Sequence, residues 1–170
     1  RQVSSKWCLN QSRNNNYDAL DEGDKGIVHW VSEILWREFY RHIIFNNPRV
    51  SKGKPFQLRY ENIPWENNPD FINAWKEGRT GIPIVDAGIR QMIETGWMHN
   101  RLRMIVAMFL SKNLLVDWRI GEAFFMKHLI DGDIASNNGG WQWSASTGTD
   151  AAPYFRICLL YTSPSPRDSL

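Results

Sequence analysis

Helical periodicity is the feature that most limits the folds open to this chain. Residues 27–45 run without glycine or proline and end at Asn46-Asn47-Pro48, which is a helix stop signal. The same period predicts a short helix over 70–76 and longer helices over 81–95, 98–115 and 120–130. Because no alternating apolar–polar run of useful length occurs, we expect an all-α fold.

Polar stretches separate the predicted helices. Residues 10–26 are rich in Asn and Asp and predict a surface connection, and Pro55 and Pro64 mark a loop that reaches about residue 68. The end of the chain, 158–170, is a low-complexity tail rich in Ser and Pro. We therefore expect one folded domain over 1–157 and a tail unrelated to it.

Composition excludes several classes of protein. A chain of 170 residues that is 42% apolar, with nine tryptophans, can bury a core, and its net charge of +2 means that any nucleic-acid site must be a local patch. The longest apolar run, 104–110, is too short for a membrane span, and no signal peptide opens the chain. Two distant cysteines fit a reducing compartment, so we expect a cytoplasmic protein. Because the first residue is Arg1, we expect a piece of a longer chain.

Common catalytic motifs are missing from the sequence. The four histidines form no paired-ligand pattern, and Asp131 and Asp133 alone are weak support for a divalent ion, so we expect no metal. No GxSxG nucleophile elbow, GxGxxG motif or phosphate loop occurs.

The segment from Asp131 to Trp143 carries the densest chemistry. It combines two carboxylates, two adjacent side-chain amides, a Gly-Gly pair and two tryptophans. Acids and amides can donate to and accept from a planar polar ring, and the indoles offer stacking surface. Composition by itself favours an ordinary Asx- and Gly-rich turn, so the rest of the sequence must decide.

Two helices carry further polar groups. On helix 27–45, one stripe holds Trp30, Glu33, Trp36, Arg37 and Tyr40. Its simpler interpretation is a core-facing aromatic stripe with an i,i+4 ion pair between Glu33 and Arg37. On the helix that begins near residue 98, Asn100, Arg103 and Met104 share a face that could contact a base or a flavin edge, or could be a solvated basic turn.

Four blocks in order resemble the helical flavin-binding domain of the DNA photolyase/cryptochrome family. The blocks are Glu33-Ile34-Leu35-Trp36-Arg37-Glu38-Phe39-Tyr40-Arg41, Thr80-Gly81-Ile82-Pro83-Ile84-Val85-Asp86-Ala87, Gly96-Trp97-Met98-His99-Asn100-Arg101-Leu102-Arg103-Met104 and the run from Asp131 to Arg156. The sequence is most similar to class I photolyases that split cyclobutane pyrimidine dimers. The resemblance implies FAD as cofactor and dimer-containing DNA as partner.

The resemblance also implies roles at the cofactor. Asp131 and Asp133 match residues against the isoalloxazine ring and ribityl chain, and Asn137 matches the amide that faces flavin N5. Arg103 would pair with Asp131. The other residues implied at the cofactor are Trp30, Glu33, Arg37 and Asn100.

On the DNA side, the resemblance makes Trp36 the wall on which the flipped dimer stacks and Met104 its apolar floor, while Glu33 and Asn100 touch both dimer and flavin. The basic residues implied at the flanking phosphates are Arg37, Arg41, Arg101, Lys52 and Lys54. Trp65, Trp118 and Trp141 match an electron relay from the surface to the flavin.

Relative to the family, the chain lacks the N-terminal domain that binds a second, antenna chromophore, and the Ser/Thr-rich segment that grips the FAD phosphates. It also departs from the family pattern at Cys158-Leu159-Leu160. We therefore expect weak FAD binding, and a monomer. The alternatives are a cryptochrome-type light sensor and a non-catalytic helical nucleic-acid-binding domain. Asn137 favours a cyclobutane photolyase over the light sensors, and Met104 favours it over the (6-4) photolyase branch.

Overall fold

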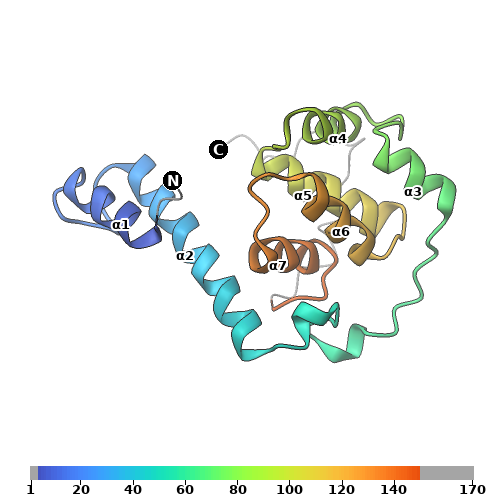
Figure 1. Cartoon of the computed structure of the whole chain (residues 1–170), viewed down its shortest axis with the longest axis horizontal. Helices are drawn as coiled ribbons and strands as arrows, with labels where there is room; N and C mark the ends of the chain where they lie inside the picture. The colour runs from blue at the N-terminus through green and yellow to red at the C-terminus, as the bar shows by residue number, and fades with distance from the viewer. Residues whose placement is uncertain (1–3, 150–170) are drawn as a thin grey trace, which may run out of the picture. The chain divides into compact units, whose positions relative to one another are not determined.

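The computed structural model describes residues 4–149 and shows helices and no strand over that range (Figure 1), which confirms the predicted all-α class. The helices are α1 Ser5–Asn14, α2 Lys25–Asn46, α3 Pro69–Lys76, α4 Pro83–Thr95, α5 Asn100–Met108, α6 Trp118–His128 and α7 Ile134–Ser144. Short 3₁₀ turns lie at Val50–Lys52 and Leu58–Tyr60, and a π-helical turn over Phe109–Asn113 continues α5. The expected domain boundary at residue 157 and the tail lie outside the described residues.

The chain divides into two compact units, Arg1–Pro48 and Arg49–Leu170. In the first unit, α1 packs against α2. The surface connection expected over 10–26 is wrong for residues 10–14, because α1 extends to Asn14. The remaining connection is held by buried Asn16, whose amide donates to the carbonyls of Ala19 and Glu22 and accepts from the Asp24 N–H. Asp24 in turn caps α2.

Helix α2 presents its aromatic residues outward. Its buried residues are Val31 and Ile34, whereas the side chains of Trp30 and Trp36 are 55% and 53% exposed. Trp36 packs edge-on against Phe39, with ring centroids 5.5 Å apart. Within the first unit, the tryptophans of the stripe are therefore not core residues.

The second unit is built on a core shared by α3 to α7. Helix α5 packs against α4 and α7, and α6 packs against α7. The core residues lie on all five helices and on the turns between them: Trp75, Ile82, Val85, Ile89, Met92, Met98, Val106, Ala107, Phe109, Leu110, Val116, Trp118, Phe125, Leu129, Trp141 and Ala145. Helix α7 thus contacts both α5 and α6, and Figure 1 shows the three helices together in this unit.

A buried carboxylate fixes the start of α4. Asp86, in the first turn of α4, accepts hydrogen bonds from the Thr80 N–H at 2.7 Å, the Thr80 hydroxyl at 2.6 Å and the Gly81 N–H at 3.0 Å. Burial would raise the pKa of Asp86, but the hydrogen bonds from Thr80 and Gly81 outweigh it and the pKa lies below its ordinary value. Within the block from Thr80 to Ala87, Asp86 therefore has a structural role: it holds the turn that precedes α4.

The Asx- and Gly-rich turn that composition by itself favours over Asp131–Trp143 does not form over residues 134–143, which belong to α7. Asp133 is the N-cap of this helix and accepts from the Ser136 N–H at 3.1 Å. Asn and Gly have low helix propensity, so tertiary contacts must sustain α7. Its buried residues supply them: Ala135, Asn138, Trp141, Gln142 and Ser144.

The other predicted helices are present with shifted ends. The helix expected over 98–115 begins at Asn100, since His99 caps it by accepting from the Arg101 N–H at 3.1 Å. The helix expected over 120–130 starts two residues earlier, after the N-cap Asp117. Among the described residues, no helix is long and apolar enough to cross a membrane.

Candidate functional site

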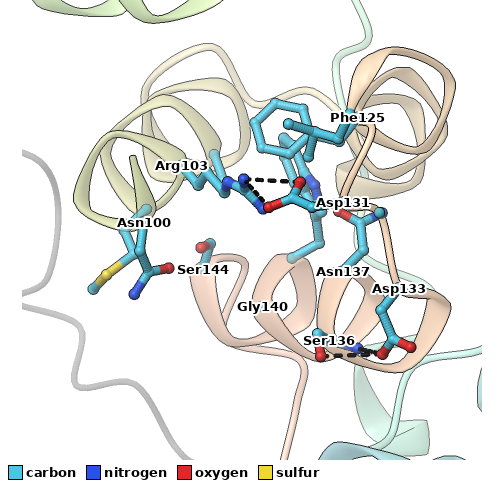
Figure 2. Close-up of a pocket in the computed structure, with 14 residues that line it drawn as sticks. Asn100, Arg103, Phe125, Asp131, Asp133, Ser136, Asn137, Gly140 and Ser144 are labelled. Atoms are coloured by element: carbon cyan, nitrogen blue, oxygen red, sulfur yellow. Dashed lines mark hydrogen bonds and ion pairs between the residues drawn. The ribbon is translucent and has the colours of Figure 1, made fainter. Parts of the chain in front are cut away.

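A cavity of about 150 Å³ lies between α5, α7 and the turn that joins α6 to α7 (Figure 2). Its lining mixes charged, amide, glycine and aromatic residues: Asn100, Arg103, Met104, Ala107, Phe125, Leu129, Asp131, Gly132, Asp133, Ser136, Asn137, Gly140, Trp141 and Ser144. Asn100, Arg103 and Met104, which the helical period placed on one face, all reach this cavity. A larger hollow of about 590 Å³ beside α3 contains none of the predicted site residues.

An ion pair closes one side of the cavity. Nη2 of Arg103 donates to both carboxylate oxygens of Asp131, at 3.0 and 2.8 Å, and Nε of Arg103 donates to the Met98 carbonyl at 2.7 Å (Figure 2). The contact expected between Arg103 and Asp131 is therefore present. Because the backbone carbonyl and the carboxylate hold the guanidinium from two directions, the pair gives the cavity a fixed polar wall.

One face of α7 forms the opposite wall. Asn137, Gly140, Trp141 and Ser144 follow one another at i, i+3, i+4 and i+7, which places them on a single helical stripe. Gly140 leaves this wall flat, because a Cβ atom built there would meet nothing within 4 Å. The absent side chain therefore keeps the cavity open next to Trp141.

The amide of Asn137 is oriented by α6. Its Nδ2 donates to the backbone carbonyl of Glu122 at 3.0 Å. This bond fixes the orientation of the amide. The Asn137 Oδ1 atom can then accept a hydrogen bond from an N–H group of a ligand. A ring nitrogen that carries a proton suits that position better than one that does not.

Trp141, which lines the same cavity, carries an unsatisfied donor. Its side chain is 2% exposed, and its indole Nε1 has no hydrogen-bond partner within the described part of the chain. A buried donor without a partner is costly, so such atoms in native proteins often mark a ligand or a water. The donor set of the cavity, with an ion pair, an amide acceptor and an indole N–H, fits the polar edge of a flavin ring.

A second polar network lies behind α7. Asn138 donates to the Glu122 carboxylate at 2.8 Å, and Gln142 donates to the Asn138 amide oxygen at 2.8 Å. Gln142 also accepts from the Phe56 N–H at 2.7 Å. Burial raises the pKa of Glu122, although the Asn138 hydrogen bond and the Arg119 charge oppose that shift. The network fixes the rotation of α7 and so the direction of Asn137.

The three tryptophans matched to a relay belong to one cluster. Trp118 and Trp141 are core residues that are 1% and 2% exposed, and half-buried Trp65 packs against the same core. Of the three, Trp65 is the one that reaches solvent.

The remaining predicted residues do not line this cavity. Trp30, Glu33, Trp36, Arg37 and Arg41 belong to α2 in the first unit, and all five are exposed there. Arg101 on α5 and Lys52 in the second unit are exposed as well. Two predicted phosphate ligands are paired within the chain, Arg41 with Glu38 at 3.1 Å and Lys54 with Glu61.

Sequence reasoning missed Gly140, Ser144 and Glu122. Gly140 and Ser144 line the cavity, and the Glu122 backbone and side chain hold Asn137 and Asn138. A search for helical spacing from Asn137 would have found the two wall residues. No sequence signal pointed to Glu122, because its role depends on the packing of α6 against α7.

The helical architecture, together with a cavity that combines an ion pair, an oriented amide and tryptophans, is that of a flavin-binding domain of the photolyase/cryptochrome kind. Residues 30–169 match the FAD binding domain of DNA photolyase, and the chain belongs to that family.

Similar proteins agree with this assignment. The chain is 56% identical over 155 residues to the deoxyribodipyrimidine photo-lyase of Escherichia coli strain K12, covering 91% of this chain and 32% of that one. An archaeal photolyase from Sulfolobus tokodaii, whose crystal structure holds two FAD molecules, superposes with a TM-score of 0.73 at 40% identity over 94% of this chain and 33% of that one. A Synechocystis cryptochrome superposes with a TM-score of 0.79 at 34% identity, covering 91% and 32%. The chain thus spans about a third of the relatives it matches.

Proposed function

We propose that the chain supplies part of the flavin and DNA site of a photolyase that uses reduced FAD and light to split cyclobutane pyrimidine dimers. One observation carries the proposal: the Arg103–Asp131 pair, Asn137 and Trp141, whose N–H has no partner in the described part of the chain, all line one cavity. This set complements a flavin ring whose N5 carries a proton. The family match of residues 30–169 supports it.

The cavity would hold only a portion of the cofactor. Its volume of about 150 Å³ is below the ~300–1,000 Å³ of pockets for drug-sized ligands, so it suits one edge of the ring system. When bound, FAD supplies the light-driven electron transfer. Arg103, Asp131 and Asn137 would orient that edge, with Asp133 and Asn100 beside it. The FAD phosphates would need groups outside this cavity.

Helix α2 would provide the contacts to DNA. Photolyases belong to the enzymes that extrude the target bases from the duplex, and stacking on an aromatic ring stabilises an extruded base by about 1–3 kcal/mol. Trp36 offers such a ring, since it is 53% exposed. Glu33 would hydrogen-bond the dimer, Met104 would contact it through an apolar surface, and Arg37, Arg41 and Arg101 would bind flanking phosphates.

The tryptophan cluster would return electrons to the flavin after oxidation. Trp141 lines the cavity, Trp118 is buried in the same core, and Trp65 reaches toward solvent. In this proposal each ring gives one electron to the ring nearer the cavity. Trp65 is then restored by an external thiol.

A chimera tests the proposal most directly. In the E. coli relative, the matching third of the chain is replaced by this sequence, and dimer-containing DNA is used as substrate. We expect light-dependent repair, and we expect Trp36→Ala to weaken binding to that DNA about tenfold or more while FAD stays bound. Phe45→Ala on the same helix is the matched control for loss of an exposed aromatic ring, because Phe39 packs against Trp36 itself.

The outcomes separate the possible functions. A chimera that binds FAD and responds to light without repairing DNA would support a cryptochrome-type sensor instead. Unchanged affinity in Trp36→Ala would remove that residue from the DNA site. In the 170-residue chain by itself, we expect weak FAD binding, measured by flavin fluorescence.

A further inference from the structure

Arg119 places a positive charge over the ring of Trp118. The guanidinium carbon lies 4.9 Å from the centroid of that ring. Trp118 is 1% exposed and the Arg119 side chain 29%, so water screens the interaction only in part. Arg59 makes a comparable contact with the ring of Tyr60, at 4.6 Å from its centroid, which is not a ring of the proposed relay.

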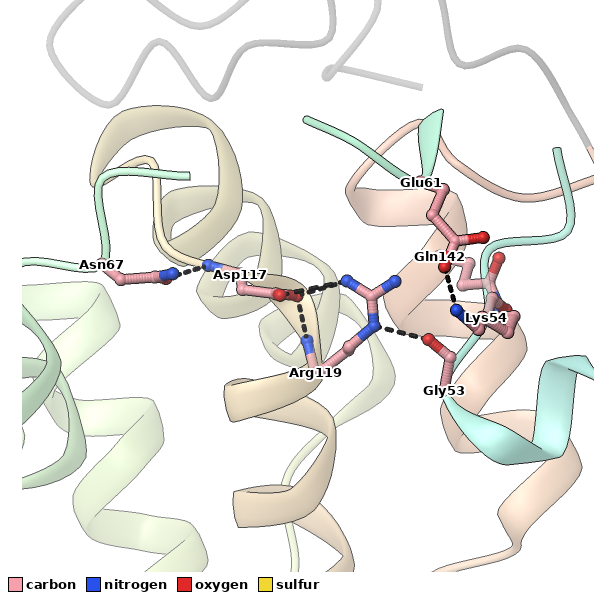
Figure 3. Close-up of polar contacts among 7 residues, drawn as sticks. All are labelled: Gly53, Lys54, Glu61, Asn67, Asp117, Arg119 and Gln142. Atoms are coloured by element: carbon pink, nitrogen blue, oxygen red, sulfur yellow. Dashed lines mark hydrogen bonds and ion pairs between the residues drawn. The ribbon is translucent and has the colours of Figure 1, made fainter. Parts of the chain in front are cut away.

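The guanidinium is held in place by groups on several sides (Figure 3). Nη1 of Arg119 donates to both carboxylate oxygens of Asp117, at 3.1 and 3.0 Å, and Nε donates to the Gly53 carbonyl. Asp117 is itself fixed, because its N–H donates to the Asn67 side chain at 2.8 Å and its carboxylate accepts from the Arg119 N–H at 3.0 Å. The positive charge therefore has one position relative to the ring.

We propose that Arg119 and Asp117 are positioning residues that set, with opposite signs, how readily Trp118 is oxidised. The inference rests on the proposed electron relay. A fixed cation over an aromatic face stabilises the neutral ring and repels the radical cation that forms when the ring loses an electron. Arg119 thus opposes oxidation of Trp118, and the adjacent Asp117 carboxylate offsets part of this effect.

Arg119 therefore affects how positive charge moves between the three tryptophans. Oxidised Trp141 takes one electron from Trp118, which becomes the radical cation while Trp141 returns to the neutral ring. Trp118 then takes one electron from Trp65, and the Trp65 radical cation can release its indole proton to water. Because Arg119 makes the positive charge unfavourable on Trp118, it disfavours the step from Trp141 and favours the step to half-buried Trp65, so little charge rests at the middle ring.

The two residues allow a paired test in the flavin-loaded chimera. The background carries Trp65→Phe, so that the positive charge stops at Trp118 and decays by return to Trp141. Arg119→Gln should lengthen the lifetime of the Trp118 radical cation, measured by transient absorption, by at least about fivefold. Asp117→Asn, which keeps an N-cap acceptor, should shorten it by a similar factor.

A structural role predicts a different pattern, because both variants break the same ion pair and would shift the lifetime in the same direction. Equal lifetimes, or shifts of the same sign, would overturn the inference. If no tryptophan radical forms even in the Trp65→Phe background, the relay fails instead. Should Arg119→Gln not fold, Asp117→Asn alone decides: a shorter lifetime supports the inference, and an unchanged or longer one sinks it.

A second readout needs no cofactor. Ultraviolet resonance Raman spectra of the 170-residue chain report a cation over an indole ring, and Trp118→Phe identifies the contribution of that ring. Arg119→Gln should remove this contribution, whereas Asp117→Asn and Arg119→Lys should keep it. A spectrum unchanged by Arg119→Gln would contradict the contact on which the inference depends.

Discussion

Gly121 of α6 lies directly against the indole ring of Trp141 of α7. A Cβ atom built on Gly121 would come within 2.1 Å of the Trp141 ring, which is far inside van der Waals contact. The absence of a side chain at this one position lets the two helices approach and lets Trp141 line the cavity. The position of a cavity residue thus depends on a glycine one helix away.

Gly121→Ala should therefore displace Trp141. Overpacking of a buried contact costs about 1–3 kcal/mol, which exceeds the gain of about 1 kcal/mol from replacing a helical glycine with alanine. We expect a net loss in the free energy of urea unfolding and a changed tryptophan emission. A variant as stable as the parent, with the same emission, would show that the indole can shift without cost.

Gly140→Ala, the same substitution on α7, should instead increase the free energy of unfolding. Its Cβ atom would meet no atom within 4 Å, so the helix gains up to about 1 kcal/mol of stability. The added methyl group would occupy the cavity beside Trp141, and we expect FAD affinity of the chimera to fall. Denaturation and flavin titration measure the two effects separately. A gain in stability with unchanged FAD affinity would place the cofactor elsewhere.

Because of Asp86, the free energy of unfolding should decrease at acid pH. Its pKa in the folded chain lies below the ordinary value of 3.8, so its stabilising effect is full above that value and is lost as pH falls through the folded pKa. Asp86→Ala should cost about 2 kcal/mol at neutral pH and less as the pH approaches 2. Urea unfolding from pH 7 downward checks this; a constant difference would mean that the carboxylate charge is unimportant.

Glu122 should have the opposite effect on the free energy of unfolding: its charge destabilises the folded chain at neutral pH. Burial raises its folded pKa above 4.5, so the charged form is disfavoured in the folded chain and its cost is present above the folded pKa. The cost disappears as the pH falls toward 4.5. Glu122→Gln keeps an acceptor for Asn138 and should be more stable than the parent at pH 7, with the difference vanishing in acid. Parallel pH profiles of the two proteins would refute this.

The Arg103–Asp131 pair should show a modest coupling energy. The side chains are 25% and 46% exposed, so solvent screens the interaction and about 1 kcal/mol is expected from a double-mutant cycle in Arg103→Met and Asp131→Asn. FAD binding should strengthen the coupling, because the ligand removes water from the pair. A cycle with no greater coupling in the loaded chimera would argue against contact with the cofactor.

The sequence predicted most of the helices because their signals are local. Helix α2 has a long run without glycine or proline and a clear stop at Asn46-Asn47-Pro48, and α4 begins at a proline. Helix α7 escaped prediction because its stability comes from elsewhere in the fold. Its low-propensity Asn-Asn-Gly-Gly stretch becomes helical once Trp141 packs against Gly121 and Gln142 bonds to the Phe56 N–H.

The sequence likewise predicted only some of the residues of the candidate site. Residue type and spacing on a single helix were enough to group Asn100, Arg103 and Met104, and all three line the cavity. The resemblance supplied the pairing of Arg103 with Asp131, which no spacing rule connects. Glu122 holds Asn137 and Asn138, and Arg119 lies over the ring of Trp118. These contacts depend on the packing of the folded chain, so the sequence did not predict them.

Helix α7 has two faces with separate duties, and this separation makes it suitable for directed evolution. Asn137, Gly140 and Ser144 line the cavity, whereas Asn138 and Gln142 tie the helix to the rest of the unit. A library that varies only the first three positions would explore new ligands and photochemistry while leaving the scaffold intact. A library that varies all five would mix altered chemistry with misfolding, and most of its members would be uninformative.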